Sequence, residues 1–210
     1  LPVESPAHGA RSIVTNPHDL LASPYGWLDT NGVAGPEFTY TRGNNTWAFD
    51  NSTADNVPVP IESPDAGASL NFDFPYDPNL EPAANSLAAV TNLFYITNKV
   101  HDITYRYGFD EEAGNFQTKN YSNLGEGDDA VLAQGLDGSG NNNADFSTFP
   151  DGFAGRMRMF LWNATGGGIV KVNAPATVGG TYFGGTTNGW GGVVTNVPLT
   201  AEAVFVNDGA

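Results

Sequence analysis

Residues 85–107 read NSLAAVTNLFYITNKVHDITYRY, and this stretch decides the fold. Apolar side chains recur in it at spacings of three and four, which is typical of an α-helix. One stripe consists of Leu93, Ile96, Val100, Ile103 and Tyr107, and a second runs through Leu87, Val90, Phe94 and His101. Asn85 is placed to cap the start of the helix and Gly108 to follow its end. Because two of its sides are apolar, we expect a long and largely buried helix.

Alternating patterns on either side of this helix predict strands. Residues 69–74 (SLNFDF) alternate apolar and polar side chains, and the arginines and apolar residues at the start of 156–162 (RMRMFLW) do the same. A Pro-Asp-Gly turn signal at 150–152 indicates that residues 142–146 and 156–162 form a hairpin. Its first strand carries unpaired amides and is expected at a sheet edge, a position that binds extended peptides in other proteins. Helix and strands together indicate an α+β fold.

The length and a change in composition indicate how the chain is divided. A chain of 210 residues holds one domain of ordinary size with a remainder. No lysine or arginine follows Lys171, and Gly-Gly pairs separate short Val- and Thr-rich segments there. We therefore predict a first domain at residues 1–165 and the start of a β-rich, incomplete domain at 166–210. The turn sequence at 207–209 normally leads into another strand, so we expect the natural chain to continue past Ala210.

Composition excludes several classes of protein. A hydrophobic content of 40% and an aromatic content of 12% indicate a packed core. The net charge of -15 argues against nucleic-acid binding, which requires basic side chains on the phosphates. No run of 18 apolar residues is present to span a membrane, and the lack of cysteine rules out a disulfide framework. The acidic, Asn-, Gly- and Thr-rich composition favours a secreted, extracellular protein, whose signal peptide would have been removed before Leu1.

No catalytic motif is complete in this chain. The three histidines, His8, His18 and His101, are too far apart for a helical metal-binding pair, and the zinc motif HExxH is absent. Cysteine and the G-x-S-x-G nucleophile motif are absent as well. His101 is followed by Asp102, but neighbouring helix positions point about 100° apart, so we expect no hydrogen bond between them. A structural role for His101 is favoured over a catalytic one.

A second candidate site is a loop with oxygen-bearing side chains. Asp137, Ser139 and Asn141 alternate with glycines at a spacing found in calcium-binding loops. The glutamate that closes an EF-hand loop is missing, so a solvated acidic loop is favoured and a calcium site remains the alternative.

Several short motifs, in the same order, resemble fungalysin metalloproteases. They are SPYGW at 23–27, TRGNN at 41–45, NLFY at 92–95, HD at 101–102, YGFDE at 107–111, AGNFQ at 113–117, NNA at 142–144, DG at 151–152 and RM at 156–157. The match covers roughly residues 8–162, and agreement of many motifs in order makes it specific. Residues from Ile169 onward resemble the start of a protease-associated domain that is inserted in bacterial relatives.

This resemblance implies the N-terminal lobe of a thermolysin-like zincin, with a mixed sheet and one long buried helix. It implies that the Asn143 side-chain amide and the Ala144 carbonyl hold the backbone of a substrate against a zinc-bound water. No catalytic residue and no zinc ligand is expected within this chain, since the HExxH segment would lie beyond Ala210. Asp145 stands where an asparagine is expected in the family.

The function that follows from the resemblance is the N-terminal portion of a secreted zinc-dependent metalloendopeptidase. Its expected partners are a protein or peptide substrate and the C-terminal remainder of the same protease. Its expected cofactor is zinc, with calcium possible. The alternative from composition alone is a non-catalytic extracellular binding module.

Overall fold

A computed structural model describes residues 13–77, 80–162, 169–172 and 180–183. The chain divides into two compact units, residues 3–163 and 164–210. In the second unit the described residues form an antiparallel pair, β5 (Ile169–Val172) and β6 (Gly180–Phe183). That residues 166–210 begin an inserted domain stays a prediction. No helix within the described ranges is long and apolar enough to cross a bilayer.

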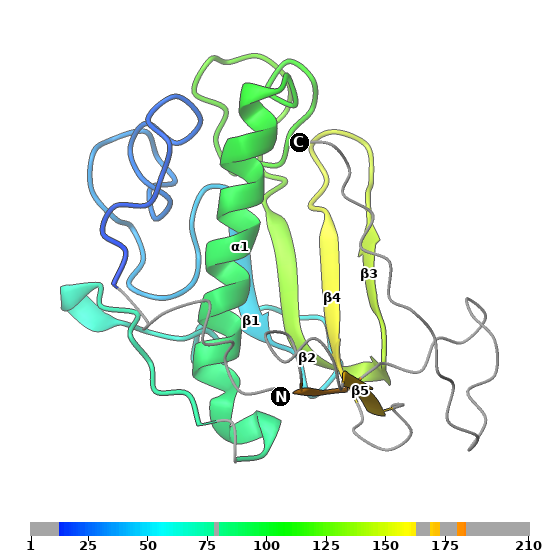
Figure 1. The fold of residues 1–210 in the computed structure, drawn as a ribbon. Coiled ribbons are helices and arrows are strands. Elements are labelled where there is room, and N and C mark those ends of the chain that lie inside the picture. The colour runs from blue at the N-terminus through cyan, green and yellow to red at the C-terminus, as the bar shows by residue number, and fades with distance from the viewer. Residues whose placement is uncertain (1–12, 78–79, 163–168, 173–179, 184–210) are drawn as a thin grey trace. The chain divides into compact units, whose positions relative to one another are not determined.

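The first unit is built on a four-stranded mixed sheet (Figure 1). Its strands are β1 (Thr46–Asp50), β2 (Val131–Asn141), β3 (Ala144–Ser147) and β4 (Arg156–Leu161). They are ordered β1-β2-β4-β3, with β1 and β4 both parallel to β2, and β3 antiparallel to β4. The predicted α+β class and mixed sheet are confirmed. The predicted hairpin is also present, with β3 at the sheet edge.

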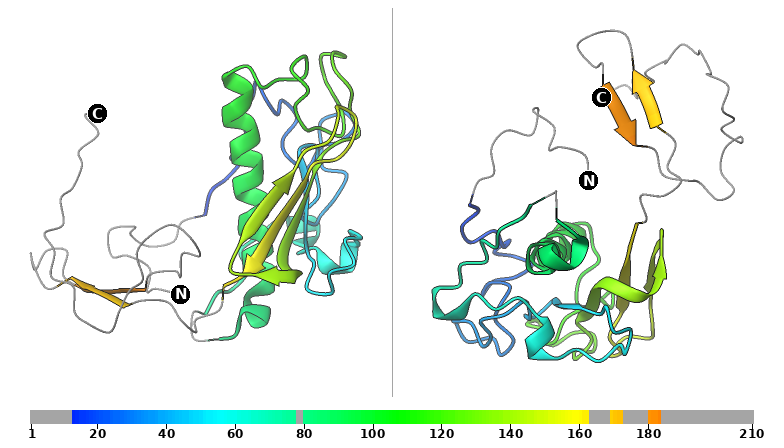
Figure 2. Two further views of the ribbon diagram at one scale, coloured as in Figure 1. Left: turned by 90° about the vertical axis from the view of Figure 1, so that its right-hand side faces the viewer. Right: turned by 90° about the horizontal axis from the view of Figure 1, so that it is seen from below.

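A single long helix, α1 (Ser86–Arg106), packs on one face of this sheet, as the views in Figures 1 and 2 show. Val90 and Phe94 contribute its apolar contacts and are buried with Ala48 of β1 and Ala133 of β2. Gly135 of β2 lets the helix approach closely, because a β-carbon there would lie 3.1 Å from Val90 Cγ2. The core is therefore formed where α1 crosses β1 and β2.

Both ends of α1 follow from local chemistry. At the C-terminal end Gly108, with φ of 92°, donates from its N–H to the carbonyl of Tyr105, and Phe109 donates to that of Thr104. This pair of bonds is a Schellman motif, so the role predicted for Gly108 is confirmed. Asn85 precedes the helix, but its side chain makes no capping bond. Its amide instead bonds the backbone N–H and carbonyl of Asp77, which ties the helix start to the preceding loop.

The prediction that α1 is largely buried is wrong for the described residues. Ile96, Val100 and Ile103 are 48 to 55% exposed, and Tyr107 is 89% exposed. The buried side of the helix combines apolar residues with polar ones, among them Asn98 and the pair His101 and Asp102. Counting apolar spacing alone therefore placed the first stripe in the core, although polar side chains occupy much of the buried face.

The strand predicted at residues 69–74 is also wrong. A 3-10 turn, η3 (Gly67–Ser69), ends at Leu70, which has a left-handed φ of 52°. The following residues belong to none of the strands of the sheet. Phe72 packs its ring on that of Phe94, with 6.3 Å between the centroids, so the apolar side of this segment lies on α1. Two further 3-10 turns are η2 (Pro60–Glu62) and η4 (Pro82–Asn85).

Candidate functional site

The candidate substrate edge is formed by β3 and the residue before it. β3 is hydrogen-bonded to β4 on one side and is the last strand of the sheet. Asn143 is exposed, and its carbonyl accepts a hydrogen bond from the N–H of Phe160 at 3.3 Å. In an antiparallel pair, bonded and non-bonded residues alternate. Since the backbone carbonyl of Asn143 is bonded to β4, the N–H and carbonyl of the next residue, Ala144, are expected to point away from β4, toward the outer edge of the sheet.

The next residue of β3 carries a charge whose partner lies directly across the hairpin. Asp145 is in register with Arg158, and the guanidinium donates through Nε at 2.9 Å and Nη2 at 2.6 Å to the two carboxylate oxygens. This bidentate geometry is the strongest arrangement for such a pair. The hydrogen bond from Arg158 holds the pKa of Asp145 below its usual value. The aspartate that departs from the family pattern is therefore paired.

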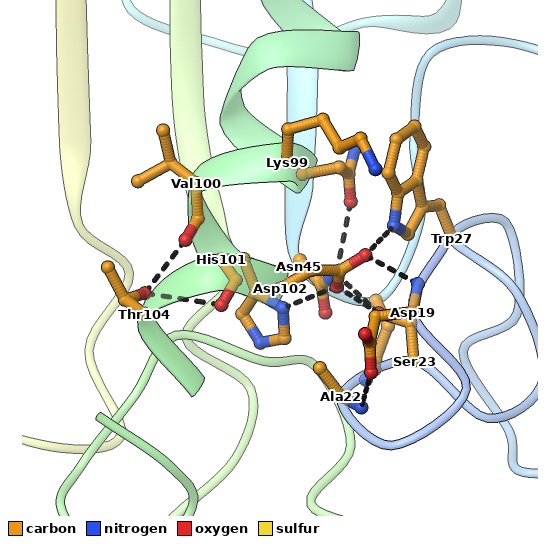
Figure 3. Close-up of polar contacts among 12 residues, drawn as sticks. Asp19, Ala22, Ser23, Trp27, Asn45, Lys99, Val100, His101, Asp102 and Thr104 are labelled. Atoms are coloured by element: carbon orange, nitrogen blue, oxygen red, sulfur yellow. Dashed lines mark hydrogen bonds and ion pairs between the residues drawn. The ribbon is translucent and has the colours of Figure 1, made fainter. Parts of the chain in front are cut away.

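A buried carboxylate organises the other end of the molecule (Figure 3). Asp102, 2% exposed, accepts hydrogen bonds from the backbone N–H of Asp19 at 2.9 Å, Ser23 Oγ at 2.7 Å and Trp27 Nε1 at 2.8 Å. Burial acts to raise the pKa of Asp102, but bonds from His101 and these donors outweigh burial and hold the pKa below its usual value. The carboxylate stays ionised because its charge is spread over several donors.

His101 is bonded to Asp102, which corrects the expectation that neighbouring helix positions cannot reach each other. Its Nδ1 lies 3.2 Å from Asp102 Oδ1, a distance that the short aspartate side chain spans by leaning toward the ring. On the other side, Nε2 lies 3.2 Å from the amide nitrogen of Asn115. Since an amide N–H donates, Nε2 accepts and the proton sits on Nδ1. Both ring nitrogens are thus occupied within the fold, which favours the structural role of His101.

Two buried asparagines extend this network. Asn45 donates through its amide nitrogen to Ser23 Oγ and to Asn98 Oδ1, both at 3.1 Å. Asn98 in turn donates to the carbonyl of Phe94 at 2.8 Å. Segments far apart in the chain, at 19–27, 44–45 and 98–102, therefore meet around one carboxylate. The sequence motifs at 23–27, 41–45 and 101–102 include neither Asp19 nor Asn98, and no contact between these motifs was predicted.

The three residues considered for calcium all lie on β2, near its end. The carboxylate of Asp137, 1% exposed, accepts from Asn51 Nδ2 at 2.5 Å and from the N–H of Ser139 at 2.9 Å, as well as from the Ser139 hydroxyl. Asn141 is exposed, and its Oδ1 accepts from Asn142 Nδ2 at 3.4 Å. These contacts join protein groups to one another. A calcium site at these residues stays a prediction.

The described residues do not fit a zinc site. Among them no group of three histidine, cysteine, aspartate or glutamate side chains is placed to hold a metal ion. Of the three histidines, His8 lies outside the described residues, and both nitrogens of His101 face protein groups.

With the edge strand and the Asp102 network in place, comparison with known proteins decides the family. The model of the fungalysin metallopeptidases (M36) matches residues 1–195. The chain belongs to this fungalysin family. The resemblance drawn from the short motifs is confirmed, and the family's description as metallopeptidases implies a metal ion.

Relatives of the fungalysin chain carry names of one kind. It is 43% identical over 162 residues to the probable extracellular metalloproteinase 5 of Trichophyton verrucosum (strain HKI 0517), covering 77% of this chain and 25% of the relative. It is 42% identical over 161 residues to extracellular metalloproteinase 5 of Trichophyton tonsurans, covering 77% and 26%. The extracellular metalloproteinase 1 of Arthroderma gypseum (strain ATCC MYA-4604 / CBS 118893) is 42% identical over 162 residues, covering 77% and 25%. The chain thus spans about a quarter of the length of these relatives.

Proposed function

We propose that this chain is the N-terminal portion of a secreted, zinc-dependent metalloendopeptidase and forms one wall of its substrate cleft. The proposal rests on membership in the fungalysin metallopeptidases and on relatives that are named extracellular metalloproteinases. The chain then provides the N-terminal lobe of a thermolysin-like fold, and the zinc ligands are contributed by residues outside it.

The observation that carries the proposal is the outer edge of β3, with which no strand among the described residues pairs. An extended peptide binds such an edge as an additional strand, through main-chain hydrogen bonds. Ala144 has its carbonyl directed to that side by the alternation of the ladder, so it accepts from a substrate N–H. The Asn143 side chain is exposed beside it, and its amide both donates and accepts. Together these groups fix the direction and register of the peptide.

Asn143→Ala tests this role in the complete protease. With two hydrogen bonds to the peptide lost, kcat/KM for an extended peptide is expected to fall about tenfold, at about 1 kcal/mol or less for each bond. Steady-state cleavage of a fluorogenic hexapeptide measures it. Asn71→Ala is the matched control, because Asn71 is an exposed asparagine that lies outside both the sheet and α1. An unchanged kcat/KM in Asn143→Ala, with folding intact, would remove Asn143 from the substrate site.

The second candidate function is a non-catalytic extracellular binding module, and the same open edge favours it. Such a module binds an extended peptide by strand addition without cleaving it. The two functions separate in the complete wild-type protein, where a peptide that binds and is released uncut identifies the module. Cleavage that a chelator abolishes and zinc restores identifies the protease.

We also propose that the remainder of the protease packs on apolar side chains that this chain leaves exposed. On α1 these are Ile96, Val100 and Ile103, and Figure 3 shows Val100 projecting from the side opposite Trp27. On the sheet face that bears α1 they are Phe146, Met159 and Leu161, which are 39 to 43% exposed. Figures 1 and 2 show β4 and β3 lying beside α1, where the helix does not cover them. Relatives of which the matched 162 residues are only a quarter have the additional chain that such a contact needs.

Val100→Asp tests this packing by comparing two lengths of protein. In the 210-residue chain, where Val100 is 53% exposed, the free energy of unfolding is expected to change by less than about 0.5 kcal/mol. In the complete protease the same charge would be buried without a partner, and the loss is expected to be about 2 kcal/mol. Urea denaturation measures both. Equal effects in the two proteins would show that this side of α1 stays exposed.

A further inference from the structure

The regular pairing of the sheet is interrupted beside the start of β3. Between β2 and β4 the register shifts twice, once between Gln134 and Asp137 and again between Asp137 and Asn141. Leu136, within the first shift, has a φ of 52°, which bends β2 out of regular strand geometry. The ladder that would normally hold β4, and through it β3, in place is therefore incomplete at this end.

A chain of polar side chains crosses the interruption. It runs from Asn51 through Asp137, Ser139 and Arg158 to Asp145, and we call these residues the polar relay. Asn51 and Asp137 are fully buried and joined at 2.5 Å. The Ser139 hydroxyl donates to Asp137 and accepts from Arg158 Nη1 at 3.2 Å, which uses both capacities of one hydroxyl.

The exposed end of the polar relay lies next to the substrate edge. Asp145 directly follows Ala144, and its two bonds to Arg158 leave the carboxylate little freedom to move relative to β4. Through Ser139 and Asp137, Arg158 is connected to Asn51, which follows β1. An edge strand held only by a four-residue hairpin ladder thus gains an attachment to the buried part of the sheet.

We propose that Asp145 and Arg158 are positioning residues that hold Asn143 and Ala144 in register for an extended peptide substrate. This inference rests on the proposed function of the β3 edge. Asp145 and Arg158 affect peptide binding by holding β3 in place, and Arg158 makes no contact with the substrate. Gly138, between Asp137 and Ser139 of the polar relay, lies so close to Ser52 that a β-carbon would come within 2.2 Å of its carbonyl oxygen.

The experiment compares Asp145→Ala, Arg158→Gln and the double variant in the complete protease. Each single change is expected to raise KM for a hexapeptide about fivefold and to leave kcat within about twofold, as for a partly exposed pair worth about 1 kcal/mol. A blocked dipeptide, too short to lie along β3, is expected to keep its KM. The double variant should be no worse than either single one, because the two residues act as a unit. Asp145→Asn, which retains an oxygen acceptor, should recover most of the binding.

A second measurement reports on the strand itself. Hydrogen exchange of the Asp145 and Ser147 amides, which the register directs toward β4, should become about fivefold faster in both single variants. Arg106→Gln is the matched control, because Arg106 forms an exposed ion pair with Asp19 at 2.6 Å far from the hairpin in sequence. This control is expected to change neither KM nor exchange in β3.

The outcomes separate the two proposals. If Asn143→Ala raises KM for the hexapeptide while the Asp145 and Arg158 variants change neither KM nor exchange, the positioning role is wrong and the substrate edge stands. If those variants affect dipeptide and hexapeptide equally, the pair contributes only to general stability and the positioning role is also wrong. If Asn143→Ala has no effect on the hexapeptide, the proposed substrate edge itself fails.

Discussion

Replacing Asp102 with alanine is expected to lower the free energy of unfolding by about 3–5 kcal/mol, because its donors lose their acceptor and each buried unpaired donor costs about 1–3 kcal/mol. The donors are the backbone N–H of Asp19, the Ser23 hydroxyl, the Trp27 indole and His101 Nδ1, and Ser23 and Trp27 are themselves buried. The contact between α1 and the segment 19–27 is the part of the fold that should loosen. Urea denaturation of the chain at pH 7, followed by Trp fluorescence, measures the loss.

The pH dependence of the same variant provides the check. Since the pKa of Asp102 is held below its usual value, its stabilising effect is complete above the unfolded pKa of about 4 and is lost as the pH falls through the lower, folded pKa. The difference in the free energy of unfolding between wild type and Asp102→Ala should therefore become smaller below about pH 4. Asp129, whose pKa burial raises, contributes with the opposite sign but equally in both proteins. Glu112→Gln, at an exposed position, should leave stability unchanged; a similarly small effect of Asp102→Ala would contradict the assigned role.

The Asp102 network also shows which part of the fold sequence reasoning reached. Spacing of apolar residues located α1 and its end at Gly108, since both depend on residues within a few positions of each other. The bonds of Asp102 to Asp19, Ser23 and Trp27 join residues 75 to 83 positions apart, and no local pattern records such a distance. His101 was judged from ideal helix geometry, which does not include the direction in which an aspartate side chain leans.

Errors in the prediction have a common physical cause. Residues 69–74 alternate like a strand, yet Phe72 packs on α1, and no strand in the described part of the chain pairs with them. Val100 and Ile103 have the spacing of a core stripe, yet they are exposed in this chain. A regular spacing of apolar residues indicates that one side of a segment packs against another part of the protein, but it does not identify that part. This chain spans about a quarter of the length of its relatives. We propose that the remaining sequence of the protease covers part of these exposed apolar side chains.

The candidate substrate edge was predicted from a different kind of evidence. The turn at 150–152 and the flanking strands were sufficient to predict the hairpin, and the structure places β3 at the sheet edge. The roles of Asn143 and Ala144 came from resemblance to the family and remain predictions. Asp137 and Ser139 were considered as calcium ligands because oxygen-bearing residues alternate there, and that site stays a prediction. In the structure the Ser139 hydroxyl donates to Asp137 and accepts from Arg158. Spacing alone does not distinguish ligands of an ion from members of a hydrogen-bonded chain.

Gly43→Ala is expected to reduce the free energy of unfolding by about 3 kcal/mol or more, since overpacking against backbone that cannot move exceeds the usual cost of an added methyl group. A β-carbon at this position would lie 1.7 Å from the carbonyl oxygen of Trp27 and 2.7 Å from its carbonyl carbon. The same carbonyl accepts a hydrogen bond from the N–H of Asn44 at 3.1 Å. The added methyl group must therefore separate two backbone segments that are bonded to each other.

Thermal unfolding of Gly43→Ala and Gly140→Ala, measured side by side, distinguishes the clash at Gly43 from a general cost of replacing glycine with alanine. The three heavy atoms nearest to a β-carbon at Gly140 would be ring atoms of Phe160, the nearest at 3.3 Å, and a side chain can turn aside for about 1 kcal/mol or less. If the two variants lost equal stability, the close approach of Gly43 to Trp27 would not be what fixes these segments. If Gly43→Ala alone is strongly destabilised, the motifs at 23–27 and 41–45 occur together because their backbones touch. Asn45, in the second of these segments, donates a hydrogen bond to Asn98 of α1. The packing of the two segments against each other then sets the position of the helix.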